Sequence, residues 1–269
     1  MAARLKRKRT WFLVLVLFFG GLFVALALHA TLDVHRLRTE YPVMVYRGPN
    51  QPPDVRFQKA RPRDWVKFSD IPREVIGAII VSEDGAFYRH KGYDPQEIVE
   101  ALKVDLKEGR YVRGASTITQ QVAKNLFLGR HKSLWRKLKE LEWAVTLEKT
   151  FRKSRIMEIY LNIAELGQGL YGVGPASLYY FNRPVSQLGA KEGAFLAMLL
   201  PSPKKHSASF RQRQMTPFAQ RAVDRILRRM AQAGYITKEE AQRLAYAPQS
   251  FEEPEPAVEP EDEETPEPE

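Results

Sequence analysis

An unbroken apolar run from Trp11 to Leu28 constrains this chain more than any other feature of its sequence. Its 18 residues, at about 1.5 Å per residue in a helix, would span roughly 27 Å, which is close to the thickness of a bilayer's hydrocarbon layer. A basic cluster over residues 4–9 precedes the run, and such clusters remain on the cytoplasmic side. We therefore expect a cytoplasmic segment over residues 1–10, a transmembrane signal anchor over 11–30, and everything after it outside the cytoplasm.

A cleaved signal peptide is the alternative interpretation of the same run. Leu26 to Ala30 offers a weak version of the small-x-small cleavage site that such a peptide needs. Signal peptides usually have a shorter apolar core, so the length of the run favours an anchor that is not cleaved.

Charge is distributed unevenly along the chain. Residues 251–269 hold ten Asp or Glu and no Lys or Arg, so removing them would raise the formal net charge from +10 to +20. A basic body suits nucleic acid, anionic lipid headgroups or a phosphorylated substrate, and the membrane segment favours the last two over nucleic acid. The sequence has no cysteine, which excludes disulfides and thiolate metal sites, and its five histidines lack metal-ligand spacing.

The remaining segments predict one mainly α-helical domain between a linker and a tail. We expect a linker over residues 31–67, with a short strand at Val43 to Tyr46 as its one candidate for regular structure, and a folded domain over 68–247. Residues 248–269 alternate Glu and Pro and are too polar to fold, so we predict a disordered acidic tail. No nucleotide-binding glycine motif is present.

Helix starts within the domain carry recognisable caps. Asp94 precedes Pro95, with Glu97 at the capping-box position, and the helix that follows should end near Gly109. The further N-cap candidates are Ser116, Ser133, Ser154, Ser186, Thr216 and Thr237.

A first candidate for chemistry lies where a predicted helix over Ile71 to Val81 ends. Glu83 and Asp84 follow this helix and lie next to aromatic residues in the sequence. An acid held against apolar groups tends to have a raised pKa, which suits a general base. Taken alone, two acids at a helix end are more often solvated surface groups.

A second candidate is the polar helix start after Gly114. Ser116 and Gln120 are spaced i, i+4 and Gln121 and Lys124 i, i+3, and helix N-termini attract anions. A capped helix with an exposed polar face would explain Ser116 but not the two glutamines.

A third candidate is the helix predicted over Ser133 to Phe151. Arg136, Lys139 and Glu140 fall on one stripe of it, although an exposed ion pair between Arg136 and Glu140 is the commoner outcome of such spacing. Beyond it, Glu158, Tyr160 and Asn162 are expected to brace a site rather than to react.

Together these segments resemble the peptidoglycan glycosyltransferases, the family of monofunctional biosynthetic transglycosylases and of the N-terminal domains of class A penicillin-binding proteins. The resemblance covers about Asp70 to Ser202. Five motifs occur in the family's order: Glu83-Asp84 with Phe87, His90 and Gly92; Gly114 with Ser116 to Gln121; Arg136-Lys137 to Glu140; Lys153 to Asn162; and Gly172 to Phe181.

The resemblance implies a lysozyme-like helical fold with a small membrane-associated jaw, in a single-pass protein of the cytoplasmic (inner) membrane whose catalytic domain is periplasmic. It implies polymerisation of lipid II into β-1,4-linked glycan strands for the cell wall, by inverting transfer and with release of undecaprenyl pyrophosphate. Since nothing after Phe210 resembles a transpeptidase, the monofunctional version is expected.

The roles implied by the resemblance fall into two groups. Glu83 would be the general base and Glu140 the second acid of the catalytic pair. The residues that would bind substrate are Ser116, Gln120, Gln121, Lys124, Lys132, Arg136, Lys137 and Lys139. Lys132 stands where the family usually has Arg, which puts bidentate phosphate contact there in doubt.

The resemblance also bears on ligands, partners and rivals. It requires no cofactor but leaves open a Mg²⁺ or Mn²⁺ ion at the pyrophosphate. Expected partners are lipid II, the growing lipid-linked strand, the membrane, into which Leu126, Phe127, Leu128 and Trp135 should dip, and proteins of cell-wall synthesis or division, but no nucleic acid. A lysozyme-like hydrolase and an inactive membrane-anchored scaffold are the rival interpretations.

Overall fold

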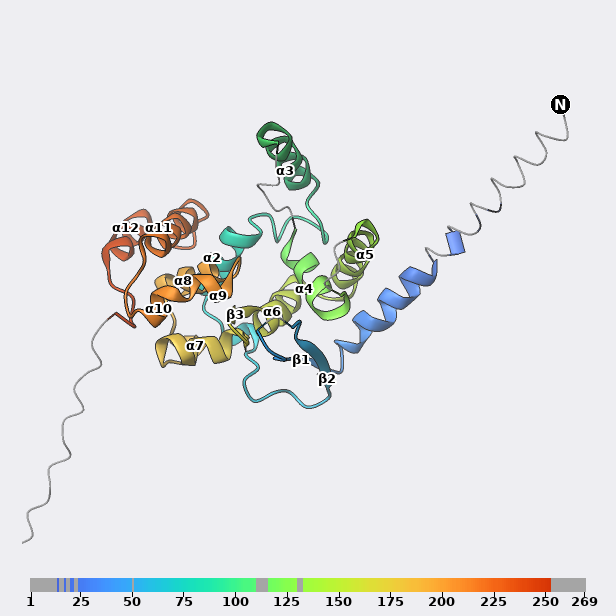
Figure 1. The fold of residues 1–269 in the computed structure, drawn as a ribbon, viewed down its shortest axis with the longest axis horizontal. Helices are drawn as coiled ribbons and strands as arrows, with labels where there is room; N and C mark the ends of the chain where they lie inside the picture. The colour runs from blue at the N-terminus through green and yellow to red at the C-terminus, as the bar shows by residue number, and fades with distance from the viewer. Residues whose placement is uncertain are drawn as a thin grey trace, which may run out of the picture.

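The computed structural model is mainly helical, as the sequence predicts (Figure 1). It describes residues 14, 17, 20, 21, 24–49, 51–109, 116–129 and 133–252. The predicted cytoplasmic segment, most of the apolar run, Gly114 and Lys132 lie outside these residues. Among the described residues, no helix is both long and apolar enough to cross a bilayer.

The elements follow one another along the chain with short connections. The first part contains β1 (Tyr41–Val45), β2 (Asp54–Gln58), η1 (Phe68–Asp70), α2 (Arg73–Glu83), α3 (Pro95–Glu108), α4 (Ile118–Phe127), α5 (Leu134–Thr150) and α6 (Lys153–Ile163). The second contains β3 (Glu165–Gly167), β4 (Leu170–Tyr171), α7 (Val173–Phe181), η2 (Val185–Gln187), α8 (Ala190–Leu199), α9 (Pro203–His206), α10 (Ala208–Arg211), α11 (Pro217–Gln232) and α12 (Lys238–Tyr246).

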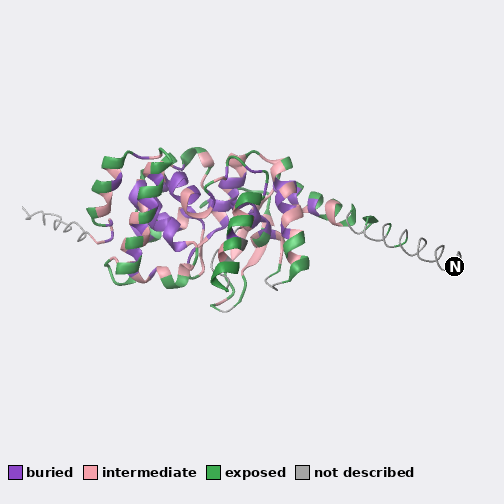
Figure 2. Ribbon diagram, turned by 90° about the horizontal axis from the view of Figure 1, so that it is seen from above, coloured by how far each residue is buried: buried purple, intermediate pink, exposed green. Residues whose placement is uncertain are grey.

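Helix α2 lies at the centre of one half of the molecule and packs along α8 and α11. Its residues from Val75 to Ile80 are all buried, and α8 is buried from Ala190 to Leu199 except at Glu192 (Figure 2). The two helices approach closely at Gly193, where a Cβ atom would lie 2.9 Å from the Cα atom of Val75. This packing fixes the position of the C-terminal end of α2, where Glu83 and Asp84 lie.

A second group of helices surrounds α4, which packs on α5 and α6. Ile118, Val122 and Ala123 of α4 are fully buried against this group. Helix α3 stands at the edge of the molecule in Figure 1, away from the α2 and α8 layer. The site described below lies where α4 and α5 meet the end of α2.

The segment predicted to be a linker, over 31–67, carries a two-stranded antiparallel sheet. β1 pairs with β2 so that Val43 lies opposite Arg56. Tyr41, Met44, Val55 and Phe57 pack against the core from these strands. The predicted strand at Val43 to Tyr46 therefore exists but starts at Tyr41, and its partner strand was not predicted because strand pairing is not a local property of the sequence.

A helix described over residues 24–36 is docked onto the same part of the molecule. Ala30, Val34 and Leu37 are fully buried there. The Trp143 indole N–H on α5 donates to the Asp33 carboxylate at 3.0 Å. The residues that follow the apolar run are thus held against the helical domain.

Most of the predicted helix caps are confirmed. Asp94 accepts from the N–H groups of Gln96 and Glu97, and α3 ends at Gly109 in the left-handed conformation. Ser133, Thr216 and Thr237 also cap their helices. Three cap predictions are wrong: the helices start after Thr117 and Arg152 in place of Ser116 and Ser154, and Ser186 lies within η2.

The chain remains ordered beyond the predicted start of the tail at residue 248. Gln249 is fully buried, and Phe251 packs against Phe195 and Phe210 with ring centroids 5.1 and 5.6 Å away. Residues 253–269 lie outside the described part of the chain.

Candidate active site

Glu83 is the last residue of α2 and lies partly buried beside α4. The Gln121 side-chain amide donates to the Glu83 carboxylate at 2.8 Å, and its oxygen accepts from the Tyr160 hydroxyl at 3.3 Å. Both ends of the amide are thus used, which fixes its orientation. No cation forms an ion pair with Glu83 among the described residues, so the carboxylate is held by an amide alone.

The surroundings of Glu83 favour its protonated form. Burial raises the pKa of the Glu83 carboxyl above its usual value, and the nearby Asp84 charge raises it further. The hydrogen bond from Gln121 and the charge of Lys124 act in the opposite direction but do not cancel the effect of burial. A carboxyl with a raised pKa is suited to accept a proton near neutrality.

Asp84 has a different environment from its neighbour. Its buried carboxylate accepts from the N–H of Ile118, the first residue of α4, at 2.9 Å, and from His90 Nε2 at 2.9 Å. Since the Gly92 N–H donates to His90 Nδ1 at 3.2 Å, the proton of the neutral ring lies on Nε2. Asp84 therefore holds the loop and the start of α4 in place.

Gly92 is required where this loop meets α5. Its φ angle is +102°, and a Cβ atom would lie 3.0 Å from the carbonyl of Ala144. Next to it, the Thr117 hydroxyl donates to the Gly92 carbonyl at 2.7 Å. The loop after α2, α4 and α5 are in this way fixed to one another.

The polar start of α4 is a capping box. The Thr117 hydroxyl accepts from the Gln120 N–H at 3.1 Å, and the Gln120 side-chain oxygen accepts from the Thr117 N–H at 3.0 Å. Gln120 thus has a structural role that its spacing from Ser116 did not suggest. The Ser116 hydroxyl instead accepts from Lys137 at 3.0 Å.

Glu140 on α5 is 2% exposed and lies between two cations. Arg136 donates to one of its oxygens at 3.1 Å, and Lys137 binds the other. Arg136 Nε is buried and has no hydrogen-bond partner among the described residues. An unused buried donor of this kind is expected to meet a partner when the site is filled.

Lys124 interacts electrostatically with both Glu83 and Glu140. Burial lowers the pKa of its ammonium group, and the charges of Arg136 and Lys137 lower it further, whereas Glu140 and Glu83 raise it. The lysine therefore lies within electrostatic reach of both acids.

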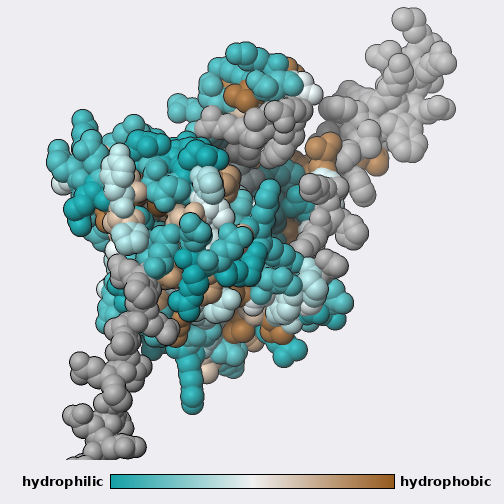
Figure 3. Space-filling model, turned by 60° about the vertical axis from the view of Figure 1, so that its left-hand side comes forward, coloured by the Kyte–Doolittle hydropathy of each residue, from teal (hydrophilic) through white to brown (hydrophobic). Residues whose placement is uncertain are grey.

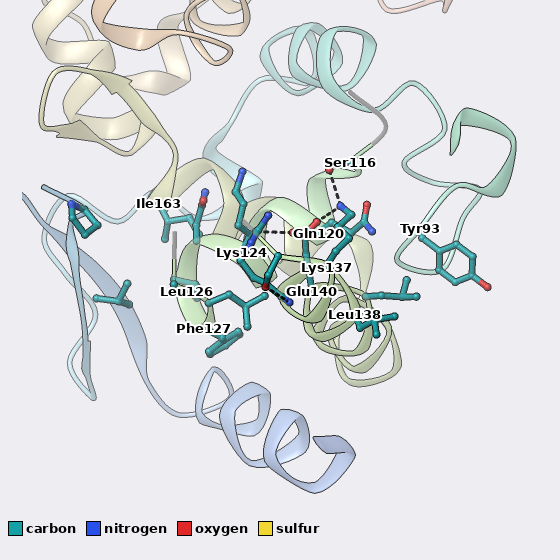
Figure 4. Close-up of a pocket in the computed structure, with 18 of the residues that line it drawn as sticks. Tyr93, Ser116, Gln120, Lys124, Leu126, Phe127, Lys137, Leu138, Glu140 and Ile163 are labelled. Carbon is teal, nitrogen blue, oxygen red and sulfur yellow. Dashed lines mark hydrogen bonds and ion pairs between the residues drawn. The ribbon is translucent and has the colours of Figure 1, made fainter. Parts of the chain in front are cut away.

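Several of these side chains, Lys124 and Glu140 among them, border a cavity of about 1590 Å³ (Figure 4). Apolar side chains from the β1–β2 sheet, α3, α4 and α5 form much of its wall. Its polar lining includes Ser116, Gln120, Lys124, Arg136, Lys137 and Glu140, and also Asn125, Ser133 and Glu165. Glu83 and Gln121 do not line it, but Lys124, which does, lies within electrostatic reach of the Glu83 carboxylate.

The structure does not bring every predicted site residue to the cavity. The Lys139 ammonium lies 5.6 Å from the centroid of the exposed Trp135 ring, and Lys139 is absent from the cavity wall. Lys132 lies outside the described residues. The wall also includes Met44, Tyr93 and Ile98. The sequence did not predict these residues, because only the tertiary fold brings the β1–β2 sheet and the region of α3 close to helix α5.

Of the apolar residues predicted to dip into the membrane, two are used inside the protein. Leu126 is buried, and Phe127 stacks on Phe57 with ring centroids 6.3 Å apart. The exposed apolar residues nearby are on α5: Leu134, Trp135 and Leu138.

Of the three residues predicted to brace the site, Tyr160 contacts it directly through Gln121, whereas Glu158 and Asn162 bind the segment before α2. Glu158 accepts from the Trp65 indole at 3.0 Å and from the Phe68 N–H at 2.9 Å. Asn162 bonds both the N–H and the carbonyl of Val66. These bonds fix the segment before α2 to α6, on which Tyr160 lies.

The Mg²⁺ or Mn²⁺ ion that the resemblance leaves open at the pyrophosphate stays a prediction. Among the described residues, no group of three or more His, Cys, Asp or Glu side chains could hold one. Glu140 is engaged by two cations, and a Mg²⁺ ion at a pyrophosphate needs only one or two carboxylates besides the substrate's own phosphates.

Comparison with known proteins gives a consistent result. Residues 53–231 match the family model described as Transglycosylase. Penicillin-binding protein 1A of Aquifex aeolicus is 43% identical over 189 residues, which cover 69% of this chain and 25% of the relative. This chain thus spans about a quarter of that relative.

Shorter relatives are matched over more of their length. The biosynthetic peptidoglycan transglycosylase of Azoarcus sp. is 41% identical over 181 residues, 67% of this chain and 74% of the relative. That of Shewanella denitrificans is 42% identical over 180 residues, 66% of this chain and 76% of the relative. The family model covers well over half of the chain and includes α2, α4, α5 and α6. The chain therefore belongs to the transglycosylase family of peptidoglycan glycosyltransferases.

Proposed function

We propose that this protein polymerises lipid II into β-1,4-linked glycan strands for the bacterial cell wall, releasing undecaprenyl pyrophosphate. Family membership supports glycosyl transfer in peptidoglycan synthesis. The arrangement of the site supports the mechanism. Glu83, the proton acceptor, forms no ion pair among the described residues, whereas Glu140 holds the two cations Arg136 and Lys137.

Glu83 is the general base in this proposal. It takes the proton of the acceptor sugar's 4-hydroxyl while that oxygen attacks the anomeric carbon of the donor and the bond to the pyrophosphate breaks. The observation that carries this role is a carboxylate with a raised pKa, held by Gln121 and by no ion pair among the described residues. An ion-paired carboxylate would be a poorer base.

The cavity beyond Lys124 holds the donor's pyrophosphate. Lys124, Arg136 and Lys137 supply positive charge there, and the buried Arg136 Nε supplies an unused donor. Fixed cations stabilise the negative charge that develops on a departing phosphate. Glu140, which the resemblance makes the second acid of the catalytic pair, is assigned a positioning role in this proposal because it holds Arg136 and Lys137.

We also propose that the site lies at a membrane. We propose that the apolar run is an N-terminal anchor and that the catalytic domain lies on the periplasmic side of the inner membrane. The docked helix over 24–36 and the exposed Leu134, Trp135 and Leu138 support contact with the bilayer next to the cavity. Both substrates would then be held at the surface by their lipid.

The decisive experiment incubates the full chain in detergent with labelled lipid II and, separately, with finished glycan strands. Polymerisation gives a ladder of long products and free undecaprenyl pyrophosphate. Cleavage of glycan without growth would identify a lysozyme-like hydrolase instead. Adding EDTA to the lipid II reaction tests whether the protein's own cations suffice, as proposed.

A further inference from the structure

Helix α11 presents a stripe of arginines that the proposed reaction does not use. Arg221, Arg225 and Arg228 are exposed and spaced i, i+4, i+7, so they lie on one face. The opposite face carries the buried residues Ala219, Val223, Ile226, Leu227 and Met230. The arginine stripe, defined as these three arginines, therefore points away from the core.

The stripe has no counter-charge within the described part of the chain. None of its three arginines forms an ion pair there. Asp224, the one acid of α11, accepts from Gln220 on the same helix at 3.0 Å. Like charges one turn apart repel one another, so a nearby acidic group would relieve this repulsion.

The chain supplies such acids directly after its last described residue. Residues 253–269 hold nine Asp or Glu and no Lys or Arg. Glu252 is held next to the start of α11. Its carboxylate accepts at 2.7 Å from the N–H of Met215, which lies two residues before α11 begins, and at 2.7 Å from the N–H of Gln249. The acidic segment thus leaves the body of the protein beside the first turn of α11.

The distances allow the segment to reach the stripe. Arg221 and Arg228 are about 10 Å apart along the helix axis, at about 1.5 Å per residue. A chain covers up to about 3.3 Å per residue, so three or four residues suffice to follow the stripe. Figure 3 brings this end of the molecule forward and shows that its surface is mostly hydrophilic.

We propose that residues 253–269 dock on the arginine stripe of their own chain. Exposed ion pairs are individually weak, so the contact is reversible and weakens as salt rises. The stripe continues toward Arg229, which donates to the Val81 carbonyl near the end of α2. The docked acids would therefore keep other polyanions off a basic surface close to the helix that carries Glu83.

The test uses a fluorescent peptide of residues 253–269 and the full chain in uncharged detergent. In a tail-neutral variant, every Asp and Glu of 253–269 is replaced by Gln or Asn. We expect this variant to bind the peptide about tenfold more tightly than the native chain, whose own tail occupies the stripe. Adding Arg221→Gln, Arg225→Gln and Arg228→Gln to the tail-neutral variant should abolish that gain.

A matched control replaces three exposed cations elsewhere, Lys59, Arg61 and Arg63, by Gln in the tail-neutral variant. Peptide binding should survive this change, and its loss would place the tail on another surface. Equal peptide binding by native and tail-neutral chains would overturn the proposal. Light scattering separates docking within one chain, which leaves a monomer, from an arginine-dependent dimer, which would contradict it.

Discussion

Glu83 at the end of α2 and Glu140 on α5 both act on Lys124, but their own surroundings are opposite. Glu83 has an amide as its hydrogen-bond partner and a pKa raised by burial. Glu140 is more deeply buried yet is bound by Arg136 and Lys137. The contrast teaches that burial alone does not make a base, because a partner cation converts a buried acid into an anchor for positive charge.

Glu83→Gln should produce the largest change in activity. The variant keeps the hydrogen bond to Gln121 but cannot accept a proton, so lipid II polymerisation should fall about 1000-fold. Full activity in this variant would remove Glu83 from its proposed role.

Stability should move the other way in the same variant. Because the pKa of Glu83 is raised in the folded state, folding favours the protonated form, and ionised Glu83 destabilises the native state as pH rises through that pKa. The neutral Gln removes this cost, so the Tm at neutral pH should be equal to or higher than that of the native chain. A lower Tm would show that Glu83 is a structural residue.

Glu140→Gln should have the opposite effect on stability. It leaves Arg136 and Lys137 without their shared carboxylate, and we expect a loss of about 1–3 kcal/mol in the free energy of unfolding. Activity should fall as well, since the cations lose their positions. Glu142→Gln on the same helix is the matched control and should change neither quantity appreciably.

Gln121→Ala should alter the pH dependence of the reaction. The Gln121 hydrogen bond lowers the pKa of Glu83, so removing it raises that pKa. The acidic limb of the kcat/KM profile should then move to higher pH. Gln120→Ala serves as the control, because it breaks the α4 capping box and should lower Tm without moving this limb.

The sequence predicts well what depends on neighbouring residues. The caps at Asp94, Ser133 and Thr216 are local signals, and the structure confirms them. Thr117 was missed in favour of Ser116 because both residue types cap helices. The choice between them depends on contacts to Gly92 and to Lys137, which the fold brings together.

The site shows the same division. Its acids and cations were predicted as a set, and the ion pair between Arg136 and Glu140 was weighed, but the pair between Lys137 and Glu140 was not predicted. Lys137 contacts Glu140, whereas Lys139, the residue placed on the predicted stripe, lies over Trp135. Helix spacing alone favours the observed pair, because side chains at i, i+3 face each other and those at i, i+1 do not.

Lys137→Gln and Lys139→Gln test that last distinction with the smallest expected effects. Lys137 lines the cavity and joins Ser116 to Glu140, so its loss should raise the KM for lipid II about tenfold. Lys139 lies outside the cavity wall, and an exposed contact between a cation and an aromatic ring contributes little, so its loss should change kcat/KM by about twofold or less. Both variants should be assayed with lipid II in detergent, where binding to a bilayer plays no part. If Lys139→Gln raised KM as much as Lys137→Gln, the substrate would extend along α5 beyond the cavity wall. Glu140 would then organise only part of the surface that binds the pyrophosphate.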